Sequence, residues 1–201
     1  YGLLLRSGND ASVVIAKEVG GSEEKFVEMM NEKAKDIGMK NTIFKNPHGL
    51  DEETKNFSTA YDMALLSKYA FSNKLYRKIV KTQKYEVSTV KKTYLWYNRN
   101  QLLTDYQYCT GGKNGYTPSA GKTLVSTASK DDLNLTIVSL NDGDIYNNHE
   151  NLYENIFSEY HRYEIIDKND FHISAETSDK NFYLKESFYY PLTEQEVEKI
   201  R

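Results

Sequence analysis

Two short polar motifs, far apart along the chain, contain residue types that could take part in chemistry. The triplet Ser7-Gly8-Asn9 stands just before an apolar helical pattern, and residues 111–117 read GGKNGYT before a β-rich region. They offer a hydroxyl, a carboxamide and an ammonium group, which can all form hydrogen bonds and of which the ammonium group is charged. Taken singly, each motif is weak, because Ser-x-Asn is typical of a helix cap or turn and a lysine among glycines is typical of an exposed loop.

Apolar periodicity predicts the elements that must hold these motifs in place. The spacing predicts helices over residues 11–19, 22–37, 58–71 and 148–160, and strands over residues 85–89, 122–129 and 133–140. Ser22 is expected to cap the second helix, with Glu23 and Glu24 in its first turn, and Gly38 is expected to end it. The last two strands, joined by three polar residues, are expected to form an antiparallel hairpin. Helices on a strand pair, with a late helix packed back on the sheet, make an α+β layered domain.

The chain is expected to contain two units. Residues 1–162 are predicted to form the layered domain, and residues 163–201 are predicted to begin a small β-rich domain. The second prediction rests on short alternating runs at Phe171, Ile173 and Ala175 and at Phe182 and Leu184.

Composition excludes several classes of protein. The 201 residues carry 26 basic and 29 acidic side chains, a net charge of −3, which argues against a nucleic-acid-binding protein with a basic face. The apolar runs are far too short to span a bilayer. A single cysteine, Cys109, excludes an internal disulfide and a cysteine-based zinc site within this chain.

The order of the two motifs and the residues that flank them make both motifs more specific than either is alone. Residues 3–11, LLLRSGNDA, resemble the second motif of the serine D,D-carboxypeptidases of the penicillin-binding protein family, and residues 112–117 resemble the third motif on its strand. Residues 41–51 and 58–64 look like the connecting region of the same enzymes. The resemblance covers about residues 1–160 and implies a penicillin-binding and serine β-lactamase-like fold that needs no metal or organic cofactor.

The resemblance implies catalytic roles for three residues. Ser7 relays a proton, and the Asn9 amide holds the substrate backbone. Lys113 supplies positive charge, which supports the serine network and attracts the terminal carboxylate of the substrate.

Four residues of the third motif are implied in substrate binding. Gly115 leaves room for substrate at the strand edge, the backbone N–H of Tyr116 serves the oxyanion hole, and Thr117 donates its hydroxyl to the carboxylate. Asn114 stands where most of the family has threonine, so we expect tuned binding rather than its loss. No arginine follows the motif before Arg162, although some relatives use one there to hold the carboxylate.

The first family motif, the Ser-x-x-Lys that carries the nucleophile, is not found before Ser7. Three such strings occur later, at Ser22, Ser88 and Ser119, and about 1.6 are expected by chance from 15 serines and 21 lysines in 201 residues. None is assigned as the nucleophile, because all three follow the second motif. Since the chain also opens at Tyr1 inside an apolar helical pattern, we expect it to be part of a longer protein whose N-terminal segment supplies the attacking serine.

The implied activity is removal of the terminal D-Ala from peptidoglycan stem peptides through a serine acyl-enzyme, with penicillin and other β-lactams as inhibitors. The resemblance also implies a location outside the cytoplasm, in the cell envelope, with membrane association in the longer protein. Three alternatives stay open: a β-lactamase, a peptidoglycan endopeptidase, or a non-catalytic cell-wall-binding relative that has lost the nucleophile.

The remaining candidates have simpler interpretations. His48 lies in a Pro-Gly turn, where a structural hydrogen bond is favoured over catalysis. His149 and His161 are expected at surface positions on the late helix, without metal-ligand spacing. Cys109 is interpreted as a packed thiol.

Overall fold

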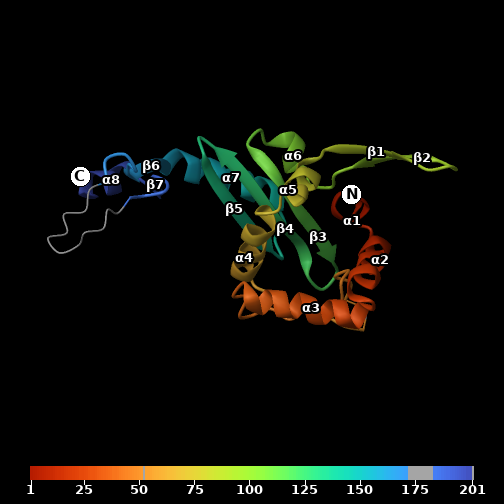
Figure 1. The fold of residues 1–201 in the computed structure, drawn as a ribbon. Helices are drawn as coiled ribbons and strands as arrows, with labels where there is room; N and C mark the ends of the chain where they lie inside the picture. The colour runs from red at the N-terminus through yellow and green to blue at the C-terminus, as the bar shows by residue number, and fades with distance from the viewer. Residues whose placement is uncertain (52, 172–182, 201) are drawn as a thin grey trace.

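A computed structural model describes residues 1–51, 53–171 and 183–200, in which helices cover a central antiparallel sheet (Figure 1). The elements are α1 (Gly2–Arg6), α2 (Asn9–Gly20), α3 (Glu23–Asp36), α4 (Ala60–Phe71), α5 (Lys74–Lys81), β1 (Lys84–Ser88), β2 (Thr93–Tyr97), α6 (Leu102–Asp105), β3 (Cys109–Thr117), β4 (Gly121–Lys130), β5 (Leu133–Leu140), α7 (Ile145–Glu159), β6 (His161–Ile166), β7 (Phe188–Leu192) and α8 (Glu194–Ile200). The central sheet has the strand order β3-β4-β5. The predicted α+β class is confirmed.

The strands β4 and β5 form the expected hairpin. Lys130 pairs with Leu133, so Asp131 and Asp132 make a two-residue loop with φ of 49° and 62°. Positive φ at both central residues is typical of the turn whose twist matches paired strands. The third-motif strand β3 pairs antiparallel with β4 and lies at the edge of the sheet.

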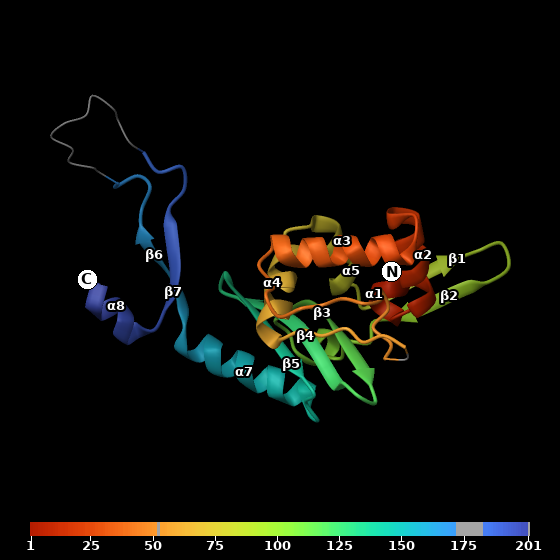
Figure 2. The ribbon, with the colours of Figure 1, turned by 90° about the horizontal axis from the view of Figure 1, so that it is seen from below.

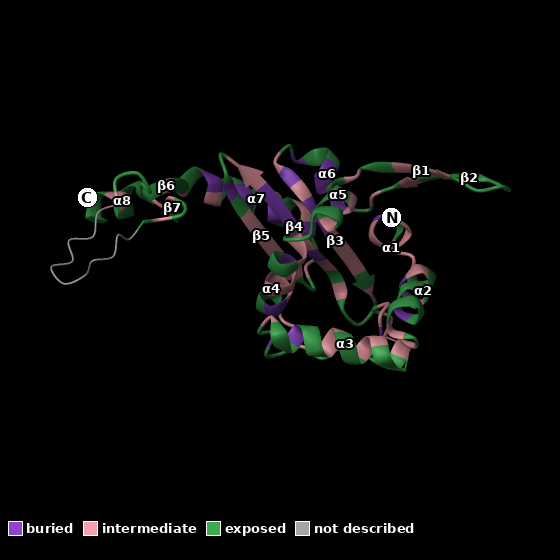
Figure 3. Ribbon diagram, in the orientation of Figure 1, coloured by how far each residue is buried: buried purple, intermediate pink, exposed green. Residues whose placement is uncertain are grey.

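Side chains alternate between the two faces of the sheet, and each face is covered by different helices. Leu124 and Ala128 of β4 point to one face, where they join Tyr153 and Phe157 of α7 in the main buried cluster. Figure 3 shows buried segments on both α7 and β4. The helices α4 and α5 pack on the opposite face, against β5 and β3 respectively. Figure 2 shows the resulting three layers, with α7 on one side of the sheet and α3 to α5 on the other.

Sequence signals placed four helices correctly and missed four short ones among the described residues. The predicted helices correspond to α2, α3, α4 and α7. Ser22 caps α3 by accepting a hydrogen bond from the Lys25 N–H at 3.2 Å, and Gly38, with φ of 84°, follows its end. The prediction omitted α1, α5, α6 and α8, which have only four to eight residues each.

The prediction that His149 lies at the surface is wrong, because this residue of α7 is 0% exposed and faces the sheet. Its Nδ1 lies 2.7 Å from Ser126 Oγ of β4, and its Nε2 lies 3.0 Å from Ser139 Oγ of β5. Ser126 Oγ also bonds the Tyr153 hydroxyl at 2.8 Å. Burial lowers the pKa of His149 to about 4, so the neutral ring ties α7 to two strands.

Beyond α7, the described residues form the antiparallel pair β6–β7 and the helix α8 (Figure 1). His161 is exposed, as expected, but it begins β6 rather than ending the helix. Of the predicted alternating runs, residues 173, 175 and 182 lie outside the described residues. The division of the chain at residue 162 stays a prediction.

Candidate active site

A cavity of about 660 Å³ opens where three separate parts of the chain meet. Ser7 of the turn after α1 and Asn9 at the start of α2 line one side, and β3 contributes residues 113–117. The loop between α3 and α4 forms the third side, with His48 and Leu50 among its lining residues. The structure therefore brings all seven predicted site residues to one cavity.

The two motifs meet at Ser7 and Lys113, which are 106 residues apart in sequence. The Lys113 ammonium donates to Ser7 Oγ and to the carbonyl oxygen of Asn114. Ser7 follows α1 with φ of 55° and ψ of 44°, a left-handed conformation that costs about 1 kcal/mol for a residue with a side chain. Strain of this kind is typical of functional positions, and here it accompanies the direct contact with Lys113.

Burial lowers the pKa of Lys113. Loss of water around the half-buried ammonium lowers its pKa from 10.5 to about 8, and the nearby positive charge of Arg99 adds to the shift. A lysine in this range exchanges its proton near neutral pH far more readily than an exposed lysine does. It also remains mostly charged at pH 7, as attraction of a carboxylate requires.

The strand β3 presents a free edge to the cavity. It pairs only with β4 among the described strands, so alternate backbone groups from Lys113 to Thr117 point away from the sheet. A Cβ on Gly115 would come within 2.8 Å of Thr123 Oγ1, so a side chain at this position would have to displace the threonine hydroxyl. The Tyr116 side chain is 69% exposed, so its backbone rather than its ring is the part fixed by the sheet.

Asn9 and Asn114 take different places around the cavity. Asn9 is the first residue of α2 and is exposed at the cavity wall. Asn114 pairs with Leu124, a residue of the core under α7, so its side chain and that of Lys113 alternate to opposite faces of the strand. The carbonyl oxygen of Asn114 accepts from Lys113.

Two charged residues at the site escaped the sequence prediction. Arg99 lines the cavity, although it precedes the third motif instead of following it. Asp51 accepts hydrogen bonds from Ser119 and Thr117, which together hold the pKa of its carboxyl below the usual value. No local pattern marks either residue, since only the path of the chain brings them to β3.

Each serine of the three Ser-x-x-Lys strings has another hydrogen-bond partner. Ser22 caps α3, Ser88 Oγ bonds Thr93 Oγ1 at 2.8 Å on the β1–β2 hairpin, and Ser119 donates to Asp51. Lys122 donates to the carbonyl oxygen of Gly143 at 3.0 Å. These three serines thus have structural hydrogen bonds in this fold.

His48 and Cys109 have the structural roles expected for them. The Nδ1 atom of His48 accepts the Leu50 N–H at 3.1 Å, which holds the turn at the cavity. Cys109 is buried, and burial raises the pKa of its thiol. In the part of the chain that the structure describes, no three side chains of metal-ligating type come together, and no helix is long and apolar enough to cross a membrane.

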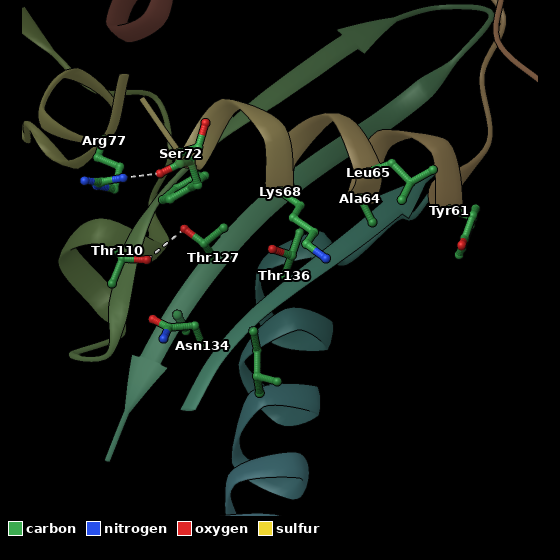
Figure 4. Close-up of a pocket in the computed structure, with 13 residues that line it drawn as sticks. Tyr61, Ala64, Leu65, Lys68, Ser72, Arg77, Thr110, Thr127, Asn134 and Thr136 are labelled. Atoms are coloured by element: carbon green, nitrogen blue, oxygen red, sulfur yellow. Dashed lines mark hydrogen bonds between the residues drawn. The ribbon is translucent and has the colours of Figure 1, made fainter. Parts of the chain in front are cut away.

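A second cavity, also of about 660 Å³, lies between α4, α5 and the sheet (Figure 4). Figure 4 shows α4 crossing the strands, with Thr127 and Thr136 on the sheet and Lys68 on the helix. Thr127 follows Val125 by two residues on β4, so this cavity and the one at Lys113 lie on the same face of the sheet.

Solved structures of similar proteins define the class. D-alanyl-D-alanine carboxypeptidase DacD from Francisella tularensis superposes with a TM-score of 0.78 at 26% identity, over 98% of this chain and 62% of that one. Penicillin binding protein 6B from Escherichia coli gives a TM-score of 0.76 at 27% identity, over 98% of this chain and 58% of that one. The layered fold with Ser7 on Lys113 is thus a penicillin-binding, D,D-peptidase type of domain.

Sequence comparison identifies the family. A family model described as D-alanyl-D-alanine carboxypeptidase matches residues 1–144, and the chain belongs to this family. It is 43% identical over 130 residues to D-alanyl-D-alanine carboxypeptidase DacF of Bacillus subtilis, across 64% of this chain and 33% of the relative. It is 38% identical over 141 residues to DacC of Escherichia coli, across 69% of this chain and 34% of the relative. The chain therefore spans about a third of the length of these curated relatives.

Proposed function

We propose that this chain forms the substrate-binding part of a serine D,D-carboxypeptidase, which removes the terminal D-Ala from peptidoglycan stem peptides through an acyl-enzyme. The observation that carries the proposal is the contact of Lys113 with Ser7 in a cavity beside the free edge of β3. Family membership and the names of the relatives support the same reaction class.

In this proposal, Ser7 relays a proton between the nucleophile and the leaving amine, with Lys113 as its partner. The lowered pKa of Lys113 supports such a relay, because proton transfer is most efficient when the pKa lies near the working pH. The remaining positive charge attracts the terminal carboxylate of the stem peptide. Asn9 holds the substrate backbone through its exposed amide.

The substrate is proposed to lie along the edge of β3 as an added strand, since main-chain hydrogen bonds to a free edge are a common way to hold an extended peptide. Gly115 keeps the edge accessible, and the N–H of Tyr116 contributes to the oxyanion hole. Asn114 and Thr117 line the same stretch.

The nucleophile is proposed to come from a segment that is not in this sequence, because all three Ser-x-x-Lys strings follow the second motif and none of their serines lines the cavity. The second cavity, on the same face of the sheet as Lys113, gives room for such a segment. The longer protein is proposed to act outside the cytoplasm in the cell envelope and to be a target of β-lactams.

Release of D-Ala tests the proposal. The parent protein that joins this chain to its nucleophile segment should release D-Ala from an N-blocked tripeptide ending in D-Ala-D-Ala. The variant Lys113→Ala should lose at least about 100-fold in kcat/KM, as expected when a charged group is removed from a reacting centre. Rapid turnover of penicillin by the parent would instead indicate a β-lactamase, and absence of any acylation would indicate a non-catalytic relative.

A further inference from the structure

The loop between α3 and α4 brings a carboxylate to the strand that carries the third motif. Asp51 Oδ2 accepts hydrogen bonds from the hydroxyls of Thr117 and Ser119, which stand 66 and 68 residues further along the chain. Thr117 ends β3, and Ser119 lies in the turn to β4. Two donors from one turn thus converge on a single carboxylate oxygen.

The loop that carries Asp51 is held by its own hydrogen bonds. The buried Asn46 amide donates to the carbonyl oxygens of Leu50 and Thr54 at 3.0 and 3.2 Å, and Asn46 Oδ1 accepts the Gly49 N–H at 2.6 Å. Asn56 Oδ1 in turn accepts the Asn46 N–H at 3.1 Å. Because these bonds fix the loop on both sides of Asp51, the carboxylate is presented to β3 in a defined position.

The contact uses the proton that Thr117 would give to a substrate. A threonine hydroxyl has one proton to donate. Thr117 Oγ1 gives this proton to Asp51 and accepts the Ala120 N–H at 3.0 Å. While Asp51 is in place, Thr117 has no proton left for a bound carboxylate, and the charge of Asp51 repels one nearby.

We propose that Asp51 is a specificity-determining residue, an internal carboxylate that competes with the terminal carboxylate of the substrate for the Thr117 hydroxyl. The inference rests on the proposed function, because it takes a peptide ending in a free carboxylate as the ligand. The substrate must displace Asp51 from Thr117 before its own carboxylate is fully bound. Asp51 therefore weakens binding of free-acid peptides and leaves peptides with a neutral end unaffected.

The test is the affinity of the chain for two peptides that differ only at the C-terminus. Calorimetric titration compares an N-blocked D-Ala-D-Ala peptide with the same peptide as its C-terminal amide. The proteins are the unchanged chain, Asp51→Asn and Glu32→Gln, which removes one carboxylate from an exposed position on α3. Ser119→Ala is a fourth protein, because it loosens the hold on Asp51 without touching Asp51 or Thr117. Thermal melting shows that each variant is folded.

The proposal predicts that Asp51→Asn lowers the Kd for the free acid about tenfold, because the neutral amide does not repel the carboxylate and accepts a weaker hydrogen bond from Thr117 than a charged oxygen does. Ser119→Ala should lower it in the same direction, by about threefold. The Kd for the amide should stay within about twofold of that for the unchanged chain. Glu32→Gln should change neither affinity.

Two other results would overturn the inference, and they differ in what else they affect. If the unchanged chain binds the free acid and Asp51→Asn binds it no more tightly, or binds both peptides less tightly, Asp51 is only a structural residue of the loop and the proposed function stands. If neither peptide binds any of the folded proteins, Asp51 competes with nothing, and the proposed recognition of a terminal carboxylate by this chain fails as well.

Discussion

The lowered pKa of Lys113 gives a sharp prediction for the pH dependence of substrate binding. With a pKa of about 8 the ammonium form makes up about 90% of the protein at pH 7, half at pH 8 and about 10% at pH 9. Only the charged form attracts the terminal carboxylate, whose own charge is constant over this range. The Kd for an N-blocked D-Ala-D-Ala peptide should therefore rise about tenfold between pH 7 and pH 9.

Calorimetric titration of the chain at pH 7, 8 and 9 measures this rise. The control is Lys113→Arg, because a guanidinium keeps its charge throughout and should give a nearly constant affinity. A lysine with the ordinary pKa of 10.5 would stay charged up to pH 9. A flat profile for the unchanged chain, or the same rise in the arginine variant, would refute the assignment of Lys113 as the titrating partner of the carboxylate.

Three further predictions concern stability. Lys113→Met should raise the melting temperature at pH 7 by a few degrees, because the pKa of Lys113 is lower in the folded chain than in the unfolded chain and its charge therefore destabilises the fold. This gain should be complete below pH 8 and should fade as the pH rises to 10.5 and beyond, because the lysine then loses its charge in both states. The buried His149 has its pKa lowered from 6.5 to about 4, so urea unfolding should show the chain losing stability as pH falls through this window, by up to about 1.4 kcal/mol per pH unit. The same loss should be absent in His149→Gln. Gly112→Ala should destabilise the fold by about 3 kcal/mol in the same assay. The new Cβ would lie 2.2 Å from the carbonyl oxygen of Val125 in β4, and the φ of Gly112 is 143°. The control Gly143→Ala should be nearly neutral, because its Cβ would meet nothing within 4 Å.

Local sequence signals predicted the elements with strong periodicity and clear punctuation. The hairpin of β4 and β5 follows from two alternating runs separated by Asp131 and Asp132, which tolerate the positive φ that a tight turn requires. The N-terminus of α3 follows from the hydroxyl of Ser22. In such places the chemistry of one or two residues decides the conformation, so no distant contact needs to be known.

The buried face of α7 shows where this reasoning fails. Leu152, Ile156 and Tyr160 have the spacing of an apolar helix face, yet Leu152 is 45% exposed. The face that packs on the sheet consists of Ile145, His149, Tyr153 and Phe157, at intervals of four residues. The histidine interrupts the apolar pattern of this face, and its burial is possible only because Ser126 and Ser139 of two distant strands bond its ring nitrogens.

The candidate site was predicted from motifs and completed by tertiary structure. Ser7 and Lys113 were paired by resemblance alone, because no periodicity relates residues 106 positions apart. Asp51 and Arg99 were missed, since a charged residue in a loop is ordinarily a solvated one. Only the path of the chain brings Arg99 to the cavity and Asp51 to Thr117. Charge near a site is therefore the feature that sequence reasoning of this kind predicts least well.

The central claim is that this chain binds the substrate and that a separate segment supplies the attacking serine. Measurement of the intact protein mass after exposure to penicillin tests this claim most directly. The chain alone, folded and saturated with penicillin, should show no covalent adduct, whereas the parent protein that includes the segment should gain the mass of one penicillin molecule. An adduct on the chain alone would place the nucleophile among its own serines. Absence of an adduct on the folded parent would contradict the assignment of acyl-enzyme chemistry to this site.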